Sequence, residues 1–272
     1  MKRSFVYIFA VTLALLAGLE AAAQRLTILH VNDTHSHIDA ERVGEIGHGG
    51  SIERAAYVDS VRTADGKNNV LLLHAGDFSQ GSSYFTLLGG EVEVKILNAM
   101  GYDATAIGNH EFDNGLDALA GRVAKLKVPV VCANYDFSGF KLGKYVKPYV
   151  IVKRGGLKVG IIGVTTDVRD VVDAAIAKDL KFIDPAEVVN RYAEYLKDEK
   201  GCDMVICLSH LGFREDKDLV EKIRNVDLVI GGHSHTFLRD IKWKKDSCGI
   251  ETPIVQEGRW GLQVGNIKVA AK

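Results

Sequence analysis

The sequence has almost no net charge and very little proline. Its 34 Lys and Arg residues nearly balance its 35 Asp and Glu residues, which leaves a formal charge of −1 at neutral pH. Without a basic excess there is no strong attraction for nucleic acid polymers or anionic membranes, so we expect neither as a partner. Only 4 of the 272 residues are proline, and no repeat or Pro/Ser-rich linker interrupts the chain. The composition, 47% hydrophobic and 25% charged, excludes collagen-like, disordered and polytopic membrane proteins.

Cysteine is also scarce, and its spacing excludes the common thiolate metal sites. None of the four cysteines stands in a CxxC pair, so any metal ligands are expected to be nitrogen and oxygen atoms. Cys132 and Cys207 lie in apolar, strand-like runs and are expected to be buried thiols. Cys202 and Cys248 could pair in an oxidising compartment, but the sequence leaves that disulfide open.

The N-terminal apolar run is too short to span a membrane, but it has the pattern of a targeting segment. Lys2 and Arg3 precede an apolar stretch over 5–16, and small residues at 21–23 offer a cleavage site. A membrane anchor is the alternative, but a spanning helix needs about 20 apolar residues. We therefore predict a signal peptide over 1–23, cleavage before Gln24, a single mature domain over 24–272, and export to the periplasm or the extracellular space.

Beyond residue 24, short apolar runs alternate with longer amphipathic stretches. This alternation predicts an α/β (α+β) fold with two layers of sheet and helices on the outside. Asp184 followed by Pro185 is typical of the N-cap and first turn of a helix. Strands are expected at 25–31, 70–76, 103–108, 128–133, 149–154, 158–164, 203–210, 226–232, 253–258 and 262–269, and helices at 51–63, 91–100, 115–126, 185–199 and 215–225.

Five of these strands end in a cluster of His, Asp or Asn residues. Ligands of open α/β sheets bind beyond the carboxyl ends of the strands, so we expect the five clusters to converge. Two clusters contain ligand pairs at i and i+2, whose side chains can turn to one side of an extended segment. The clusters hold Asp33 and His35, Asp77 after Gly76, Asn109 and His110 before Glu111, His210, and His233 and His235 after two glycines.

Each cluster by itself is weak evidence for a metal site. A histidine at a strand end is more often a hydrogen-bonded surface residue than a ligand. Together, however, the clusters hold about the seven or eight ligands of a two-metal hydrolase, in which Asp77 could bridge the cations through its two oxygens. The candidate metal ligands are Asp33, His35, Asp77, Asn109, His210, His233 and His235, and His110 is left over.

The order of these motifs resembles that of the calcineurin-like metallophosphoesterases: D-x-H, G-D, G-N-H-E, H and G-H-x-H. GNHEFD followed by NYD and GGHSH resembles the 5′-nucleotidase branch, and the likeness covers nearly all of 25–269. It implies a four-layer αββα sandwich and a metallophosphoesterase catalytic domain over 24–272. It also implies two metal groups joined by Asp77, with Asp33, His35 and His235 in one and Asn109, His210 and His233 in the other. His235 stands where some relatives carry glutamine, so the metal preference can differ.

A two-metal site implies a direct attack of water on phosphorus. Two divalent cations lower the pKa of water and neutralise charge on the phosphoryl oxygens, so no covalent phosphoenzyme is needed. Imidazole, carboxylate and amide ligands suit Mn, Zn, Fe, Co or Ni more than Ca, and the identity stays open. His110 is the candidate acid for the leaving group, and Asp113, which could orient it, matches the family's His-Asp pair. The alternative role for Asp113 is N-cap of a helix from Gly115.

These observations predict an exported phosphoesterase of phosphate monoesters, above all nucleotides. The nucleotidases that the chain resembles carry a second, C-terminal domain that stacks the base and contributes arginines, and no obvious aromatic pair for stacking stands between 25 and 272. We therefore expect a separately encoded C-terminal nucleotidase domain as a partner. One alternative is a broad phosphomonoesterase or 2′,3′-cyclic phosphodiesterase acting alone. Another is a non-enzymatic metal-binding subunit of a two-chain system, although a structural site would not require His110 and Asp113.

Overall fold

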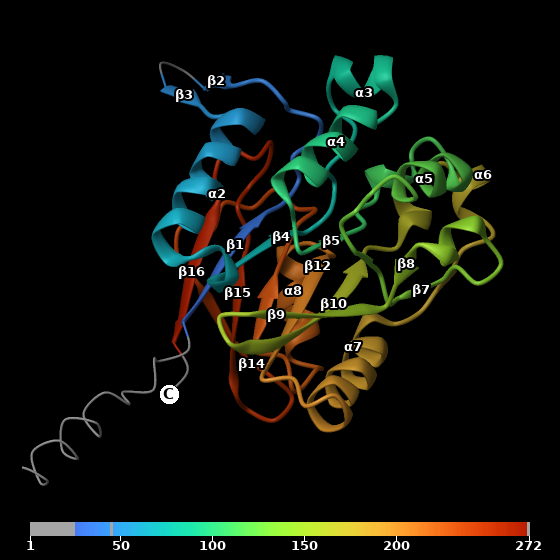
Figure 1. Ribbon diagram of the computed structural model, residues 1–272. Coiled ribbons are helices and arrows are strands. Elements are labelled where there is room, and N and C mark those ends of the chain that lie inside the picture. The colour runs from blue at the N-terminus through green and yellow to red at the C-terminus, as the bar shows by residue number, and fades with distance from the viewer. Residues whose placement is uncertain (1–24, 44–45, 271–272) are drawn as a thin grey trace, which may run out of the picture.

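The computed structural model describes residues 25–43 and 46–270 and contains two six-stranded sheets packed face to face (Figure 1). The predicted signal peptide over 1–23 lies outside the described residues. Within the two described ranges, no helix combines the length and the apolar character that crossing a membrane requires.

The first sheet is formed mainly by the N-terminal half of the chain. Its strands are β1 (Arg25–Val31), β4 (Val70–His74), β5 (Ala104–Ala106), β6 (Val130–Val131), β8 (Val146–Lys147) and β16 (Gly265–Ala270). They lie in the order β16-β1-β4-β5-β6-β8. From β1 to β8 all neighbours are parallel, and β16 pairs antiparallel with β1. The carboxyl ends of β1, β4 and β5 therefore share one edge of the sheet.

The second sheet is formed by the C-terminal half. Its strands are β9 (Tyr149–Arg154), β10 (Leu157–Thr165), β12 (Met204–His210), β13 (Leu228–Ile230), β14 (Lys242–Lys245) and β15 (Glu251–Val255). They lie in the order β14-β15-β13-β12-β10-β9. The four central strands are parallel, and the two edge strands, β14 and β9, are antiparallel to their neighbours.

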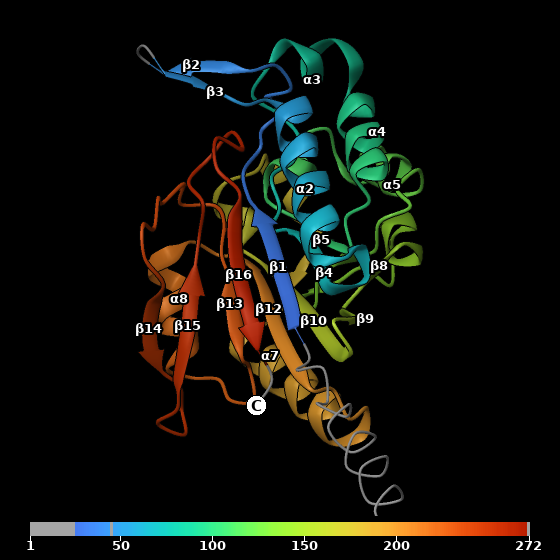
Figure 2. The same cartoon turned by 60° about the vertical axis from the view of Figure 1, so that its left-hand side comes forward.

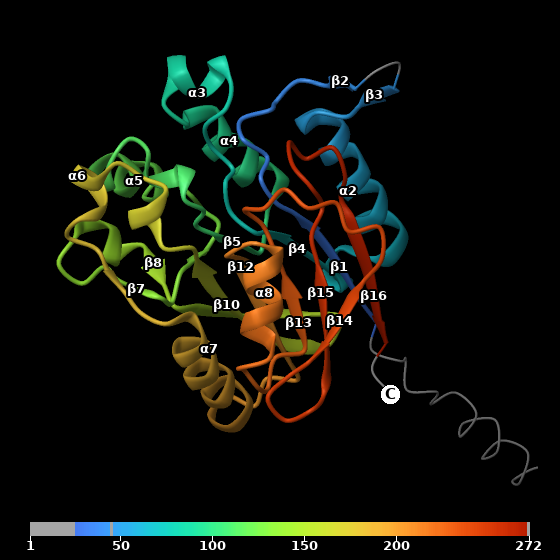
Figure 3. The same cartoon turned by 180° about the vertical axis from the view of Figure 1, so that it is seen from behind.

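Helices cover the outer face of each sheet. On the first sheet, α2 (Ser51–Asp65) and α4 (Glu91–Met100) pack over β1 and β4 (Figure 2). On the second, α7 (Pro185–Glu194) and α8 (Phe213–Val220) pack over β10, β12 and β13 (Figure 3). A further group of buried hydrophobic side chains packs around α5 (Leu116–Val123). The predicted αββα sandwich is confirmed.

Alternation of side chains along the strands explains these layers. In β1, Leu26 and Ile28 belong to the core between the sheets, whereas Leu29 and Val31 belong to the core under α2 and α4. Because successive side chains of a strand point to opposite faces, a strand that is apolar at every position is covered on both sides.

The predicted elements are confirmed with small shifts at their ends. Strands β1 and β9 and helix α4 have the predicted bounds, while β5 and β6 are shorter. Asp184 caps α7 by accepting the Glu187 N–H, and Pro185 is the first residue of the helix. Strands β8 and β14 escaped prediction, and so did the short elements β2 (Glu41–Val43), β3 (Ile46–His48), β7 (Tyr135–Asp136), β11 (Lys181–Phe182), α3 (Ser83–Leu88) and α6 (Ala174–Ala177). All four cysteines are free thiols, so Cys202 and Cys248 are not paired, and Cys132 and Cys207 are buried as expected.

Candidate active site

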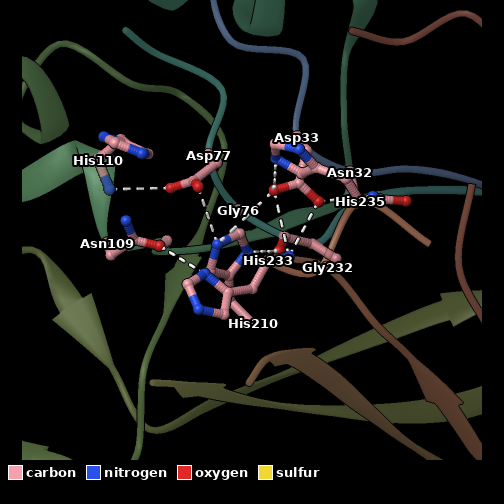
Figure 4. A network of polar contacts seen from close by, with 12 residues as sticks. Asn32, Asp33, Gly76, Asp77, Asn109, His110, His210, Gly232, His233 and His235 are labelled. Atoms are coloured by element: carbon pink, nitrogen blue, oxygen red, sulfur yellow. Dashed lines mark hydrogen bonds and ion pairs between the residues drawn. The ribbon is translucent and has the colours of Figure 1, made fainter. Parts of the chain in front are cut away.

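The five polar clusters meet where the carboxyl ends of the two sheets come together (Figure 4). β1, β4 and β5 of the first sheet and β12 and β13 of the second each lead directly into one cluster. Each of the seven predicted ligand residues and His110 makes a close contact with another member of this set. Their convergence follows from parallel strands in two sheets with their carboxyl ends on the same side.

The backbone at the candidate ligands differs from the extended form expected for the i, i+2 pairs. Asp33 and His35 have φ values of 48° and 46°, and His233 and His235 have values of 71° and 53°. Asp77 has a φ of 55°. Left-handed backbone is unfavourable for residues other than glycine, and strain of this kind is held in place at functional sites by the surrounding structure. These turns, rather than strand alternation, aim the side chains at one another.

The first group comprises Asp33, His35 and His235. The Nε2 atoms of His35 and His235 lie 2.9 Å apart. Asp33 Oδ1 lies 3.7 Å from Nε2 of His35 and 3.4 Å from Nε2 of His235. One carboxylate oxygen and two imidazole nitrogens, drawn from loops 200 residues apart, therefore surround a common point.

The second group comprises Asp77, His210, His233 and Asn109. His210 Nε2 lies 3.0 Å from Asp77 Oδ2, and Asn109 Oδ1 lies 2.8 Å from His233 Nδ1. The candidate ligand atoms of Asp77, His210 and His233 all lie within 4.8 Å of one another. His210 is fully buried, and its Nδ1 contacts the Ala75 carbonyl oxygen at 2.6 Å, which fixes the orientation of its ring.

Asp77 lies between the two groups. Its Oδ1 accepts the backbone N–H of His110 at 2.9 Å, whereas its Oδ2 lies 3.0 Å from His210 and 3.8 Å from His35. Oδ2 therefore faces both groups, whereas Oδ1 accepts a backbone hydrogen bond. The bridging role of Asp77 stays a prediction.

His110 forms a third, overlapping group with His35 and Asp77, and it carries the predicted aspartate partner. His110 Nδ1 lies 2.8 Å from Asp113 Oδ2, and the His110 ring meets that of His35 edge-on at 5.3 Å. Helix α5 begins at Leu116 with Gly115 as its N-cap and no side-chain cap, so Asp113 does not cap it. The hydrogen bond that His110 donates to Asp113 raises the pKa of His110 above its ordinary value.

The buried charges of the site perturb one another strongly. Burial by itself lowers the pKa of His210, but the Asp77 and Asp33 carboxylates outweigh it and raise the pKa to about 10. Burial would raise the pKa of Asp77, yet His210 and the neighbouring imidazoles hold it below its usual range. Burial lowers the pKa of His35 and of His233. Carboxylates this deeply buried need positive charge beside them.

These residues fit divalent cations. The two groups combine buried carboxylate oxygens, imidazole nitrogens and an amide oxygen, and this mixed set suits borderline transition metals. In such sites the residues behind the ligands hold them in orientation, and here Asn32 does so. Its Nδ2 donates to Asp33 Oδ2 at 2.6 Å, and its Oδ1 accepts the Glu257 N–H.

Sequence reasoning missed two residues that hold the loops. Glu111 is fully buried, and its Oε2 accepts the N–H groups of Asp77 at 2.9 Å and Gly108 at 2.7 Å. Gln256 donates to the Gly232 carbonyl oxygen at 2.8 Å and so holds the turn before His233. Glu111 stands inside the GNHE motif, which was a signal for it, whereas nothing in the sequence near Gln256 indicates its role.

Comparisons with known proteins agree with this geometry. The family model described as calcineurin-like phosphoesterase matches residues 26–237. A snake venom 5′-nucleotidase of Gloydius brevicauda is 34% identical over 275 residues, which are 93% of this chain and 46% of that protein. A solved 5′-nucleotidase precursor from Thermus thermophilus superposes with a TM-score of 0.84 at 35% identity, covering 90% of this chain and 51% of the other. An NAD nucleotidase of Haemophilus influenzae has a TM-score of 0.80 at 29% identity, covering 90% and 47%.

The chain thus spans about half the length of the relatives that it matches. These relatives are hydrolases of phosphate esters, and their family uses divalent metals. A shared fold over most of the chain, with candidate metal-binding groups at the strand ends, makes this chain a member of the calcineurin-like phosphoesterase family, with 5′-nucleotidases as its homologues.

Proposed function

We propose that this chain is the catalytic domain of an exported, two-metal phosphoesterase that hydrolyses phosphate monoesters of nucleotides. The observation that carries the proposal is the convergence of the candidate ligands in overlapping groups, with Asp77 Oδ2 facing both His35 and His210. A structural metal site closes around one ion, whereas two adjacent sites joined by a carboxylate are typical of phosphoryl transfer.

We assign one group of candidate ligands to each cation. Asp33, His35 and His235 would hold one cation, and Asn109, His210 and His233 would hold the other, with Asp77 shared. When bound, such cations lower the pKa of water and stabilise negative charge on the phosphoryl oxygens. Manganese, zinc, iron, cobalt and nickel all suit these ligands.

His110 protonates the leaving alkoxide in this proposal. Asp113 holds the His110 ring through Nδ1, which leaves Nε2 to face the substrate. The backbone N–H of His110 also donates to Asp77, so the acid is positioned by the same carboxylate that the two metal groups share. A bound and oriented acid of this kind contributes about 100-fold or more to the rate.

Nucleotides are the proposed substrates because the relatives are 5′-nucleotidases. A broader activity toward monoesters or 2′,3′-cyclic diesters is the second candidate. It is favoured by similarity to a trifunctional nucleotide phosphoesterase of Bacillus subtilis, 31% identical over 90% of this chain. A solved structure of that phosphoesterase superposes on this chain with a TM-score of 0.74.

Export and a partner complete the proposal. The segment over 1–23 has the pattern of a signal peptide, and one relative is named a precursor and another a venom protein. Since the relatives are about twice as long, we propose that a C-terminal nucleotidase domain contributes to substrate binding. N-terminal sequencing of the exported product is expected to begin at Gln24, and an unprocessed product would contradict this part.

Phosphate release tests the catalytic proposal. The purified chain, loaded with Mn²⁺, is given AMP, a 2′,3′-cyclic nucleotide or p-nitrophenyl phosphate, and each assay is repeated with EDTA. We expect metal-dependent hydrolysis of AMP. Hydrolysis of the aryl or cyclic ester alone would favour the second candidate or a missing partner domain, and release of phosphate that EDTA leaves unchanged would overturn the metal mechanism.

A further inference from the structure

His74, the last residue of β4, lies behind the candidate ligands and is not one of them. Its side chain is buried, 1% exposed, and it packs edge-on against Phe78 and beside Tyr102, with ring centroids 6.0 Å and 5.8 Å away. It belongs to none of the groups whose atoms converge for a metal. Burying a histidine among apolar side chains costs free energy unless both ring nitrogens have polar partners.

Both ring nitrogens of His74 contact the loops that carry candidate ligands. Nδ1 lies 3.2 Å from the backbone nitrogen of Gly76, the residue before Asp77. Nε2 lies 3.0 Å from the hydroxyl oxygen of Thr34, the residue between Asp33 and His35. The His74 side chain therefore touches the loop after β1 and the turn after β4.

The partners determine the tautomer of the ring. An amide N–H can only donate, so Nδ1 of His74 must accept and carries no proton. The proton of the neutral ring is then on Nε2, which donates to Thr34 Oγ1. The Thr34 hydroxyl in turn has the Phe78 carbonyl oxygen as its acceptor, at 3.5 Å. The three hydrogen bonds are therefore mutually consistent: Gly76 donates to His74, His74 donates to Thr34, and Thr34 donates to Phe78.

The two loops need such a tie because their backbones are strained. Asp33, His35 and Asp77 all have positive φ values. Backbone hydrogen bonds already join the loops. The Asp33 N–H donates to the Gly76 carbonyl oxygen at 3.0 Å, and the His35 N–H donates to the Asp77 carbonyl oxygen at 3.0 Å. The His74 ring adds a side-chain contact at Thr34.

We propose that His74 is a positioning residue, whose Nε2–H tautomer ties the loop of Asp33 and His35 to the turn of Asp77 and so sets the spacing of three metal ligands from two strands. This inference rests on the proposed function, since it assumes that those residues bind metal. Its consequence is measured as metal affinity, because contacts of this kind behind metal ligands typically change affinity or activity by about 10 to 100-fold.

Thr34 offers the cleaner substitution. Thr34→Val removes the acceptor of the His74 proton and keeps the shape of the side chain, whereas Thr34→Ser keeps the hydroxyl and serves as the matched control. The Mn²⁺ dissociation constant of each purified, metal-free chain is measured by titration calorimetry. We expect Thr34→Val to weaken Mn²⁺ binding by about 10-fold or more and Thr34→Ser to stay within about 2-fold of the unchanged chain.

His74→Leu, alone and combined with Thr34→Val, tests the tie itself. If the two residues act through one hydrogen bond, the double variant is expected to bind Mn²⁺ no more weakly than His74→Leu alone. Three results would overturn the inference. The losses of Mn²⁺ affinity in the two single variants could multiply in the double variant, Thr34→Val could leave the affinity unchanged, or Thr34→Ser could bind Mn²⁺ as weakly as Thr34→Val. An unchanged chain that binds no Mn²⁺ would overturn the proposed function and this inference with it, so the two failures are distinguishable. Should His74→Leu not fold, the Thr34 pair decides.

Discussion

At the scale of single residues, the candidate site depends on groups that each serve more than one neighbour. Asp77 accepts the His110 N–H with one oxygen and faces His35 and His210 with the other. Glu111, deeper in the fold, accepts backbone N–H groups from the turns after β4 and β5. Removing one such group leaves several buried partners unpaired, so the effects of substitutions here are expected to be large.

The His110 acid gives the first prediction. His110→Ala is expected to keep both metals and to lower turnover by at least about 100-fold, because the leaving group loses its proton donor. Asp113→Asn, which removes only the charge that orients the ring, is expected to lower turnover less. Turnover and metal content are measured on the same preparations. Full activity in His110→Ala would remove the acid role, and loss of metal would reassign the residue as a ligand.

The buried Glu111 carboxylate gives the second. In the unchanged chain, the N–H groups of Asp77 and Gly108 donate to the Glu111 carboxyl group. Glu111→Gln replaces that acceptor with an amide, and we expect the free energy of unfolding to fall by at least about 2 kcal/mol. Glu91→Gln is the control, because Glu91 is exposed and contacts Lys125 across the surface. Urea unfolding in EDTA compares the two without a contribution from metal. Equal midpoints for both variants would show that Glu111 does not hold the turns.

At the scale of secondary structure, β10 illustrates how closely the two sheets approach. A Cβ atom on Gly163 would lie 2.2 Å from the carbonyl oxygen of Val131, which belongs to β6 in the other sheet. The Gly163 carbonyl oxygen also accepts the Ala133 N–H at 2.7 Å. Backbone from the two sheets therefore comes into direct contact here, and only a residue without a side chain fits between them.

The third prediction follows from that contact. Gly163→Ala is expected to lower the free energy of unfolding by about 1 to 3 kcal/mol, because the backbone of one sheet must move to admit a methyl group. Gly121→Ala is the matched control. Gly121 lies in α5, and a Cβ atom there would have no other atom within 4 Å, so this change is expected to be neutral or stabilising by up to about 1 kcal/mol. The free energies of unfolding are measured by chemical denaturation. An equal loss of stability in Gly163→Ala and Gly121→Ala would contradict the close contact at Gly163.

At the scale of the whole molecule, the candidate site joins the two sheets. Asp33, His35 and Asp77 follow strands of the first sheet. In the second sheet, His210 ends β12, and His233 and His235 follow β13. The group of Asp33, His35 and His235 and the group of Asp77, His210 and His233 each contain residues from both sheets. A cation bound in either group would therefore connect the two halves of the sandwich, and such binding stabilises the folded state in proportion to its affinity.

Thermal unfolding gives the fourth prediction. At a Mn²⁺ concentration about 100 times the dissociation constant, each site adds about 2.7 kcal/mol to the stability of the folded chain. We therefore expect Mn²⁺ to raise the Tm by at least about 5 °C over the value in EDTA. Asp77→Asn, which weakens the shared ligand, is expected to show a smaller rise. If the Tm of the unchanged chain is the same with Mn²⁺ as with EDTA, the ligand groups do not bind this metal.

Local patterns in the sequence were sufficient for most of the fold. The bounds of β1, β9 and α4, the cap at Asp184 and the polar clusters at five strand ends follow from the periods of helices and strands and from capping chemistry, which involve neighbouring residues. The division of the candidate ligands into two groups came from resemblance to a family, and the structure groups Asp33 with His35 and His235 in the same way. Strands β7 and β11 were missed because each has only two residues, too few for an alternating pattern to show.

Tertiary structure alone decided the contacts between residues far apart in the sequence. The sequence determined that five strands end in ligand-type residues and that His110 has an aspartate three positions away. It could not determine that Asp77 turns one oxygen to the His110 backbone, that Glu111 holds two turns, or that His74 meets Thr34 across 40 residues. Those contacts depend on the order and packing of the strands, because a side chain 40 or 200 residues away becomes a neighbour only after the sheets have formed.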